Sequence, residues 1–158
     1  HLLDTQELEG LYPKAAFLDS REVVLFGEKG FVLYQADSKK IETQENFESE
    51  INSVLCTNQK LGFIFKNEDD NGKYRMEIYN KAGKKSSTYY FDLDYSGMTA
   101  DDDEVILYND EEMLIYQMGG RVRFRGTFNT AVTSVMPSWE DGLYWLIDDQ
   151  SLREIRIR

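Results

Sequence analysis

Few side chains in this sequence are suited to covalent chemistry. The single histidine is His1 and the single cysteine is Cys56. A hydrolytic set that pairs histidine with a serine or cysteine nucleophile therefore has no base except at the terminus, and a zinc site of histidines and cysteines has too few ligands. Cys56 ends an apolar run, so we interpret it as a buried core thiol. We expect no catalytic residue, no cofactor and no metal site.

Carboxylate clusters are the remaining candidates for chemistry. The segment 67–72 (Asn-Glu-Asp-Asp-Asn-Gly) places oxygen ligands at alternate positions before a glycine, as calcium loops do. However, Lys73 and Arg75 stand where further ligands belong, and Ile78 occupies the place of the bidentate glutamate. A polar hairpin turn explains this segment. The denser run 101–104 is interpreted as a solvated link between two strands.

A weak repeat indicates which elements carry these loops. An apolar run, a polar turn and a second apolar run recur four times, as β-hairpins do. The first runs begin at Val23, Leu61, Val105 and Leu143, which are 38, 44 and 38 residues apart, and the second runs end at Tyr34, Tyr79, Tyr116 and Ile157. Another run precedes each pair, at 15–18, 51–55, 96–99 and 132–136. An outer fourth strand is clearest at 87–91 and 122–128.

A period near 40 residues is typical of β-propeller blades. We therefore predict an all-β fold, a β-propeller segment formed as a single array over residues 1–158. Its four blade-like repeats lie at about 12–47, 48–92, 93–128 and 129–158. The array is interpreted as half of a larger ring or as a closed four-bladed ring, with 1–11 as a closing outer strand for the last repeat. An ordinary sandwich or barrel with coincidental spacing is the alternative.

Composition limits the partners. The chain has 29 Asp+Glu against 18 Lys+Arg, a net charge of −11. Because nucleic-acid backbones and anionic membrane surfaces are also negative, we expect this segment to bind neither. Of its 158 residues, 41% are hydrophobic and 13% aromatic, which is enough for one well-packed domain and too much for a disordered chain.

The predicted architecture places many acids on one face, because the loops between the second and third strands of successive blades lie on the same side. A negative face favours cations or basic partners. The candidate partner contacts in these loops are Asp69, Asp70, Asp110, Glu111, Glu112, Asp148 and Asp149. Trp139 follows Pro137 in a turn between the first and second strands of the last repeat. It is a candidate contact for a sugar or peptide, although packing against a neighbouring blade is the alternative. Trp145 is expected in the core.

Two resemblances add to this interpretation. The last repeat, 143–149 followed by 152–155, resembles a blade of the low-density-lipoprotein-receptor type, whose motif is Tyr-Trp-Thr-Asp. The whole chain resembles an uncharacterised family of Gram-positive bacterial propellers that end in a short basic-apolar strand, as 154–158 does. That resemblance implies an N-terminal membrane anchor upstream, missing N-terminal blades and an extracytoplasmic location. It implies no activity.

Together these patterns favour a non-catalytic binding or scaffold module whose partner is a protein or a carbohydrate. The alternative is a carbohydrate- or ester-active propeller enzyme with carboxylates near the channel, which would require acidic side chains on the first strand of each repeat. A cytoplasmic location is the alternative to an extracytoplasmic one. If the chain is half of a ring, we expect a homodimer that dissociates when Phe26 or Tyr144 is made charged.

Overall fold

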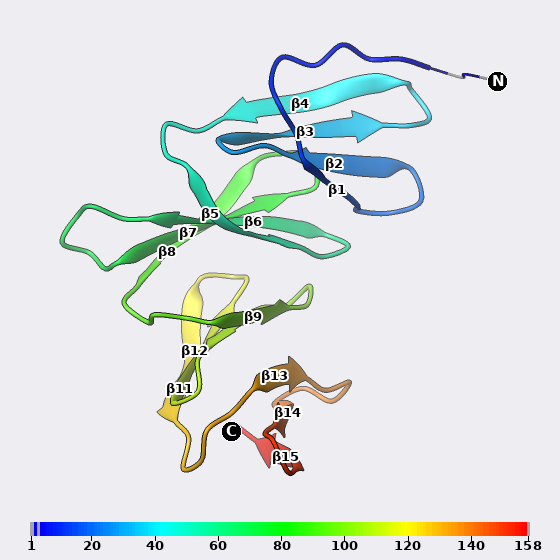
Figure 1. Ribbon diagram of the computed structural model, residues 1–158. Coiled ribbons are helices and arrows are strands. Elements are labelled where there is room, and N and C mark those ends of the chain that lie inside the picture. The colour runs from blue at the N-terminus through cyan, green and yellow to red at the C-terminus, as the bar shows by residue number, and fades with distance from the viewer. Residues whose placement is uncertain (1, 3, 158) are drawn as a thin grey trace. The chain divides into compact units, whose positions relative to one another are not determined.

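Four antiparallel β-sheets follow one another along the chain in a computed structural model that describes residue 2 and residues 4–157 (Figure 1). The first sheet contains β1 (Lys14–Phe17), β2 (Glu22–Phe26), β3 (Gly30–Gln35) and β4 (Lys40–Asn46). The second contains β5 (Ile51–Cys56), β6 (Lys60–Lys66), β7 (Tyr74–Asn80) and β8 (Lys85–Phe91). The third contains β9 (Gly97–Ala100), β10 (Glu104–Tyr108), β11 (Glu112–Gln117) and β12 (Arg121–Thr127). The last contains β13 (Ser134–Pro137), β14 (Leu143–Ile147) and β15 (Leu152–Arg156).

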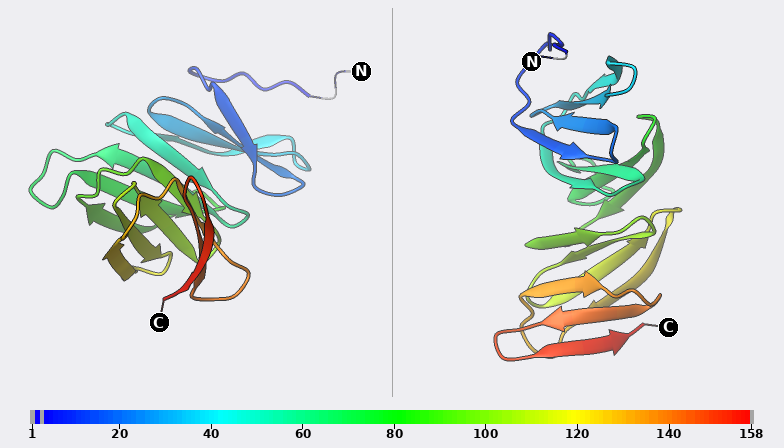
Figure 2. Two further views of the ribbon diagram at one scale, coloured as in Figure 1. Left: turned by 60° about the horizontal axis from the view of Figure 1, so that its bottom comes forward. Right: turned by 90° about the vertical axis from the view of Figure 1, so that its right-hand side faces the viewer.

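Within each sheet the strands pair in chain order, so every connection is a hairpin. Figure 2 shows this for β13, β14 and β15, drawn from orange to red. The third and fourth strands of two sheets share a register shift, between Leu33 and Tyr34 and between Ile115 and Tyr116. No helix occurs in the described part of the chain, and so none there is long and apolar enough to cross a membrane. The predicted all-β fold of four blade-like repeats is confirmed.

By their internal contacts the described residues divide into two compact units. Unit 1 comprises the chain up to Glu68 together with Arg75–Thr88, and unit 2 comprises Asp69–Tyr74 together with the chain from Tyr89 onward. Each unit has its own core.

An aromatic cluster forms the core of unit 1. Phe63 is fully buried and lies at its centre, with ring centroids 4.9 Å from Phe31, 5.1 Å from Phe47, 5.5 Å from Tyr79 and 6.1 Å from Phe26. Phe47 lies just after β4, and the other four rings lie on strands of the first two sheets, whose alternate side chains point to opposite faces, so that one face of each sheet supplies rings to this core. Cys56 packs against this core and is partly buried, and burial raises the pKa of its thiol.

The core of unit 2 lies between the third and last sheets. Its fully buried side chains include Ile106 and Ile115 from the third sheet and Tyr144 and Val135 from the last. Because Tyr144 faces this core, its neighbour Trp145 faces the other side of the last sheet and is only half-buried. The expectation that Trp145 lies in the core is therefore wrong. All five residues of β14 are apolar, so the sequence does not reveal which of them face the core.

The same alternation corrects the variants expected to break a homodimer. Phe26 and Tyr144 both point into the cores of their own units, so a charge at either position would destabilise the fold. Leu25 points to the other face of the first sheet, where it lines a pocket with Leu8 and Val32.

The N-terminal segment lies against the first sheet. Among its described residues, none belongs to a strand. The hydroxyl of Tyr34 donates a hydrogen bond to Asp4 at 2.7 Å, and the Gln6 side chain donates one to the carbonyl of Lys39 at 3.2 Å. Closure of the last repeat by residues 1–11, and the size of the ring, stay predictions.

Candidate functional site

Three of the four turns between the first and second strands of a sheet are built in the same way. In each, one side-chain oxygen accepts hydrogen bonds from the backbone N–H groups two and three residues later. Asp19 accepts from Arg21 and Glu22, Thr57 from Gln59 and Lys60, and Asp101 from Asp103 and Glu104, at 2.8–3.3 Å. These side chains therefore have a structural task.

The turn between β13 and β14 differs from the other three. It spans residues 138–142. As in the other three turns, a backbone bond joins its ends, from Ser138 N–H to the Leu143 carbonyl at 2.9 Å, but here the second backbone bond, from Leu143 N–H to the Glu140 carbonyl at 3.1 Å, stands where the others have side-chain oxygen bonds. Gly142 has a φ of 76°, which favours glycine. The turn presents Trp139, whose side chain is 87% exposed and whose ring centroid lies 6.3 Å from that of Trp145.

Trp139 borders a pocket of about 550 Å³ within unit 2, here called the Trp139 pocket. Three segments line this pocket: the turn 138–142, the N-terminal end of β10, and the turn between β11 and β12. Its other charged and polar lining residues are Asp101, Asp103, Glu104, Gln117, Arg123, Ser138, Glu140 and Asp141. The volume lies in the range of small-ligand sites.

A buried network supports one wall of the Trp139 pocket. Glu104 is 5% exposed, and its Oε2 accepts hydrogen bonds from the Tyr144 hydroxyl at 2.9 Å and from Arg123 at 3.2 Å. Arg123 also donates to Asp141 at 2.6 Å. Burial raises the pKa of Glu104, while the Tyr144 hydroxyl and the charge of Arg123 act against that shift. The hydrogen bond from Arg123, with its charge, lowers the pKa of Asp141.

The interpretation of 101–104 as a solvated link is thus wrong for its last residue. Asp102 and Asp103 are exposed, but Glu104 begins β10 and points inward. Sequence reasoning missed Glu104, Arg123 and Tyr144 as members of one network. The one available signal was Arg123 in the alternating strand 121–127, where an inward-facing cation requires an acidic partner.

Most of the predicted acidic contacts in unit 2 follow the C-terminal ends of β10 and β14, whereas the Trp139 pocket lies at the N-terminal ends of these strands. Trp139 precedes β14, whereas Asp148 and Asp149 follow it. Likewise, Asp110, Glu111 and Glu112 follow β10. The structure therefore does not bring Trp139 together with these acids.

The acids in these loops differ in their roles. Asp148 accepts hydrogen bonds from the N–H groups of Gln150 and Ser151 and from the Ser151 hydroxyl, and these lower its pKa. It also pairs with Arg153 at 3.0 Å. Glu112 lies 3.7 Å from Arg125 and is half-buried. The acids at 110, 111 and 149 are exposed.

Asp69 and Asp70 lie in the loop between β6 and β7 and are exposed. The ammonium group of Lys73 in the same loop pairs with Asp94, and the Lys73 backbone N–H donates to Asp92 at 3.0 Å, so both groups of Lys73 are held by acids outside the loop. Across the described residues, no three His, Cys, Asp or Glu side chains come together as metal ligands would. The four first strands, β1, β5, β9 and β13, contain no Asp or Glu.

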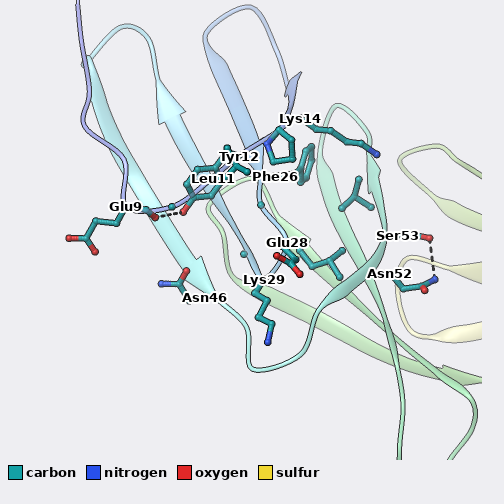
Figure 3. Close-up of a pocket in the computed structure, with 16 residues that line it drawn as sticks. Glu9, Leu11, Tyr12, Lys14, Phe26, Glu28, Lys29, Asn46, Asn52 and Ser53 are labelled. Atoms are coloured by element: carbon teal, nitrogen blue, oxygen red, sulfur yellow. Dashed lines mark hydrogen bonds between the residues drawn. The ribbon is translucent and has the colours of Figure 1, made fainter.

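Unit 1 has a pocket of its own, about 510 Å³ in volume (Figure 3). Residues 9–14, the loop 27–30 and strand β5 line it, and we call it the Leu11 pocket. Leu11 is 82% exposed at this pocket, near Tyr12, whose hydroxyl donates to the Glu9 carbonyl at 3.2 Å. Phe26, Ile51 and Val54 supply apolar lining, and Lys14, Glu28 and Lys29 supply charge. The sequence patterns did not indicate this pocket, because residues 9–11, which carry Leu11, lie before the first repeat.

Four blade-like antiparallel sheets, with pockets formed by turns and loops, define a propeller-type protein. Over residues 5–157 the sequence matches the family model described as "Family of unknown function (DUF5711)", and the chain belongs to this family. No curated protein matches the sequence.

Solved structures share the fold. The computationally designed protein Ika4 is 10% identical with a TM-score of 0.63, and the match covers 98% of this chain and 96% of Ika4. Hsv2p of Kluyveromyces lactis is 12% identical with a TM-score of 0.67, covering 96% and 51%. The propeller-like BBS1N, solved in complex with ARL6DN, is 13% identical with a TM-score of 0.62, covering 96% and 53%. The chain thus spans about half the length of the latter two, and the likeness concerns the fold alone.

Proposed function

We propose that this chain is a non-catalytic module that binds a partner protein outside the cytoplasm, as part of a protein anchored in the membrane by an upstream segment. The location and the anchor rest on the resemblance to Gram-positive propellers. In the full-length protein, protease added to intact cells should cleave the module. Protection until the cells are lysed would contradict the proposed location.

One observation carries the binding proposal. Leu11 and Trp139 are each more than four-fifths exposed, and each borders a pocket on a segment outside the sheets. Exposing a large apolar side chain to water is unfavourable, and such residues beside a concave surface are typical of partner contacts. Leu2 is equally exposed at 85% but lines neither pocket.

A displayed library of random peptides tests the proposal, with a glycan array in parallel. We expect selected peptides to bind the wild-type chain and to lose most of their affinity for Trp139→Ala or Leu11→Ser. Leu2→Ser is the matched control and should bind normally. If no peptide is enriched, or if enriched peptides bind both variants as well as the wild type, the proposal fails. Glycans that bind in place of peptides would assign the partner as a carbohydrate.

The buried carboxyl of Glu104, with its raised pKa, favours a second candidate, a carbohydrate- or ester-active enzyme. A carboxyl of this kind beside an exposed tryptophan suits general acid catalysis. Against it, Tyr144 and Arg123 already engage one oxygen of Glu104. Hydrolysis of nitrophenyl glycosides or esters that disappears in Glu104→Gln would support the enzyme, and no turnover of either class would count against it.

A further inference from the structure

We propose that the Trp139 pocket binds an arginine side chain of the partner protein. This inference rests on the proposed binding function and names the chemistry of the residue that the pocket accepts.

The indole of Trp139 is exposed on a turn that differs from its equivalents. Three of the four equivalent turns are short and closed by an Asp or Thr side chain, whereas the fourth is longer and places Trp139 87% exposed at a pocket. Hairpin closure does not require this difference, because the other sheets make the same connection with fewer residues. Trp is the aromatic side chain that binds cations best on its ring face.

The lining of the Trp139 pocket is predominantly acidic. Five carboxylates and one guanidinium, that of Arg123, line the pocket. Three of these carboxylates already have cationic partners, since Glu104 and Asp141 pair with Arg123 and Glu140 pairs with Arg156 at 2.6 Å. Asp103 is exposed, and no salt bridge to a cation of the described chain engages it. The pocket therefore repels anions and offers a carboxylate to an incoming cation.

One polar atom beside the Trp139 pocket lacks a hydrogen-bond partner in the described part of the chain. The hydroxyl oxygen of Ser138, a residue that also lines the pocket, is buried and has no hydrogen-bond partner among the described atoms. A buried polar atom without a partner is unfavourable. A ligand with several N–H donors would supply one.

Arginine meets these three requirements together. Its planar guanidinium stacks on an indole, pairs with a carboxylate through two parallel hydrogen bonds, and has further N–H groups for a hydroxyl oxygen. Lysine provides the positive charge, but it has neither a planar group that stacks on an indole nor two parallel N–H donors for a carboxylate. A pocket of about 550 Å³ also leaves room for residues that flank the arginine.

Fluorescence anisotropy of a labelled Gly-rich peptide with one central arginine tests the proposal. The comparison peptide replaces arginine by citrulline, which keeps the shape and removes the charge. We expect the citrulline peptide to bind the wild-type chain at least about tenfold more weakly, and the arginine peptide to bind Trp139→Ala at least about tenfold more weakly. Asp103→Asn should weaken binding several-fold, and binding should decrease with added salt.

Asp149→Asn is the matched control, because it removes one exposed carboxylate at the opposite end of β14. Its affinity for the arginine peptide should equal that of the wild type. Equal binding of the citrulline peptide, or equal losses in Asp149→Asn and Asp103→Asn, would overturn the proposal. If library peptides without arginine, or glycans, bind in a Trp139-dependent way, the binding function stands and the arginine assignment is wrong.

Discussion

Replacing Tyr144 by Phe removes a single hydroxyl from the buried wall of the Trp139 pocket. That hydroxyl lies 2.9 Å from Oε2 of Glu104, and the two residues are 0% and 5% exposed. Because the acceptor is a charged carboxylate that water cannot easily reach, losing the donor should lower the free energy of unfolding by about 1.5–3 kcal/mol at neutral pH. The shape of the core is otherwise kept, since Phe fills the space of the ring.

The size of this loss should depend on pH. Burial holds the pKa of Glu104 above its ordinary 4.5, so the folded state binds a proton on this carboxyl more readily than the unfolded state. The contribution of this proton binding to the free energy of unfolding is fully present below about pH 4.5 and is lost as the pH rises through the folded-state pKa of Glu104. Removing the Tyr144 hydroxyl raises that pKa further, so Tyr144→Phe should lose most stability at neutral pH and least where Glu104 is protonated in both proteins.

Urea unfolding of both proteins between neutral pH and about pH 4.5 measures this difference. Tyr108→Phe is the matched control, because Tyr108 lies in the same core and its hydroxyl faces the neutral Ser134 hydroxyl at 3.5 Å. The free energy of unfolding of Tyr108→Phe should be lower than that of the wild type by at most about 0.5–1.5 kcal/mol, and this difference should change little over the pH range. The reasoning is refuted if Tyr144→Phe costs no more than Tyr108→Phe at neutral pH, or if its cost grows as the pH falls.

Three further predictions concern unit 1. Phe63→Ala should lower the free energy of unfolding by about 3–5 kcal/mol in urea titrations, whereas Phe17→Ala, 75% exposed, should change it by less than about 0.5 kcal/mol; similar effects would contradict the aromatic core. Gly30→Ala should lower the midpoint of thermal unfolding, because its Cβ would lie 2.2 Å from a backbone oxygen, and Gly119→Ala, with no heavy atom within 4 Å, should not. If copies of the chain pair through the face of the first sheet that carries Leu25, light scattering should show that the wild type is a dimer and that Leu25→Lys is a monomer. A wild-type monomer would exclude this pairing.

The fold was predictable because hairpins are local. Val, Ile and aromatic runs that flank short polar turns specify strand pairs without reference to the rest of the chain, and four such pairs at a similar period specify four sheets. The outer strand Arg121–Thr127 was found through its alternation, and the structure pairs it with β11. Strand ends moved by a residue or two, as at β13, which begins at Ser134 rather than residue 132.

The Glu104 network was less predictable because its side chains, from the third and last sheets, must point to the two faces that pack together. Glu104, Arg123 and Tyr144 come from three different strands. Their sequence spacing does not reveal which face each side chain takes, and an apolar run such as Leu143–Ile147 has apolar residues on both faces. A run of acids hides an inward member for the same reason. Which face of a strand is buried depends on the side on which a second sheet packs, and this packing is a tertiary property.

The repeat itself provides a comparison that a single sequence otherwise lacks. Where four segments perform the same connection, the features that three of them share are those the fold requires, and a departure in the fourth needs another explanation. The segments after β1, β5 and β9 have four, three and three residues and share their side-chain closure, so the five-residue turn with an exposed Trp139 stands apart on structural grounds. The acids in the loops after β10 and β14 do not stand apart in this way, because Asn109 and Asp148 close those loops through the same type of side-chain bonds. Trp139 is therefore a stronger candidate for partner contact than the acidic loops.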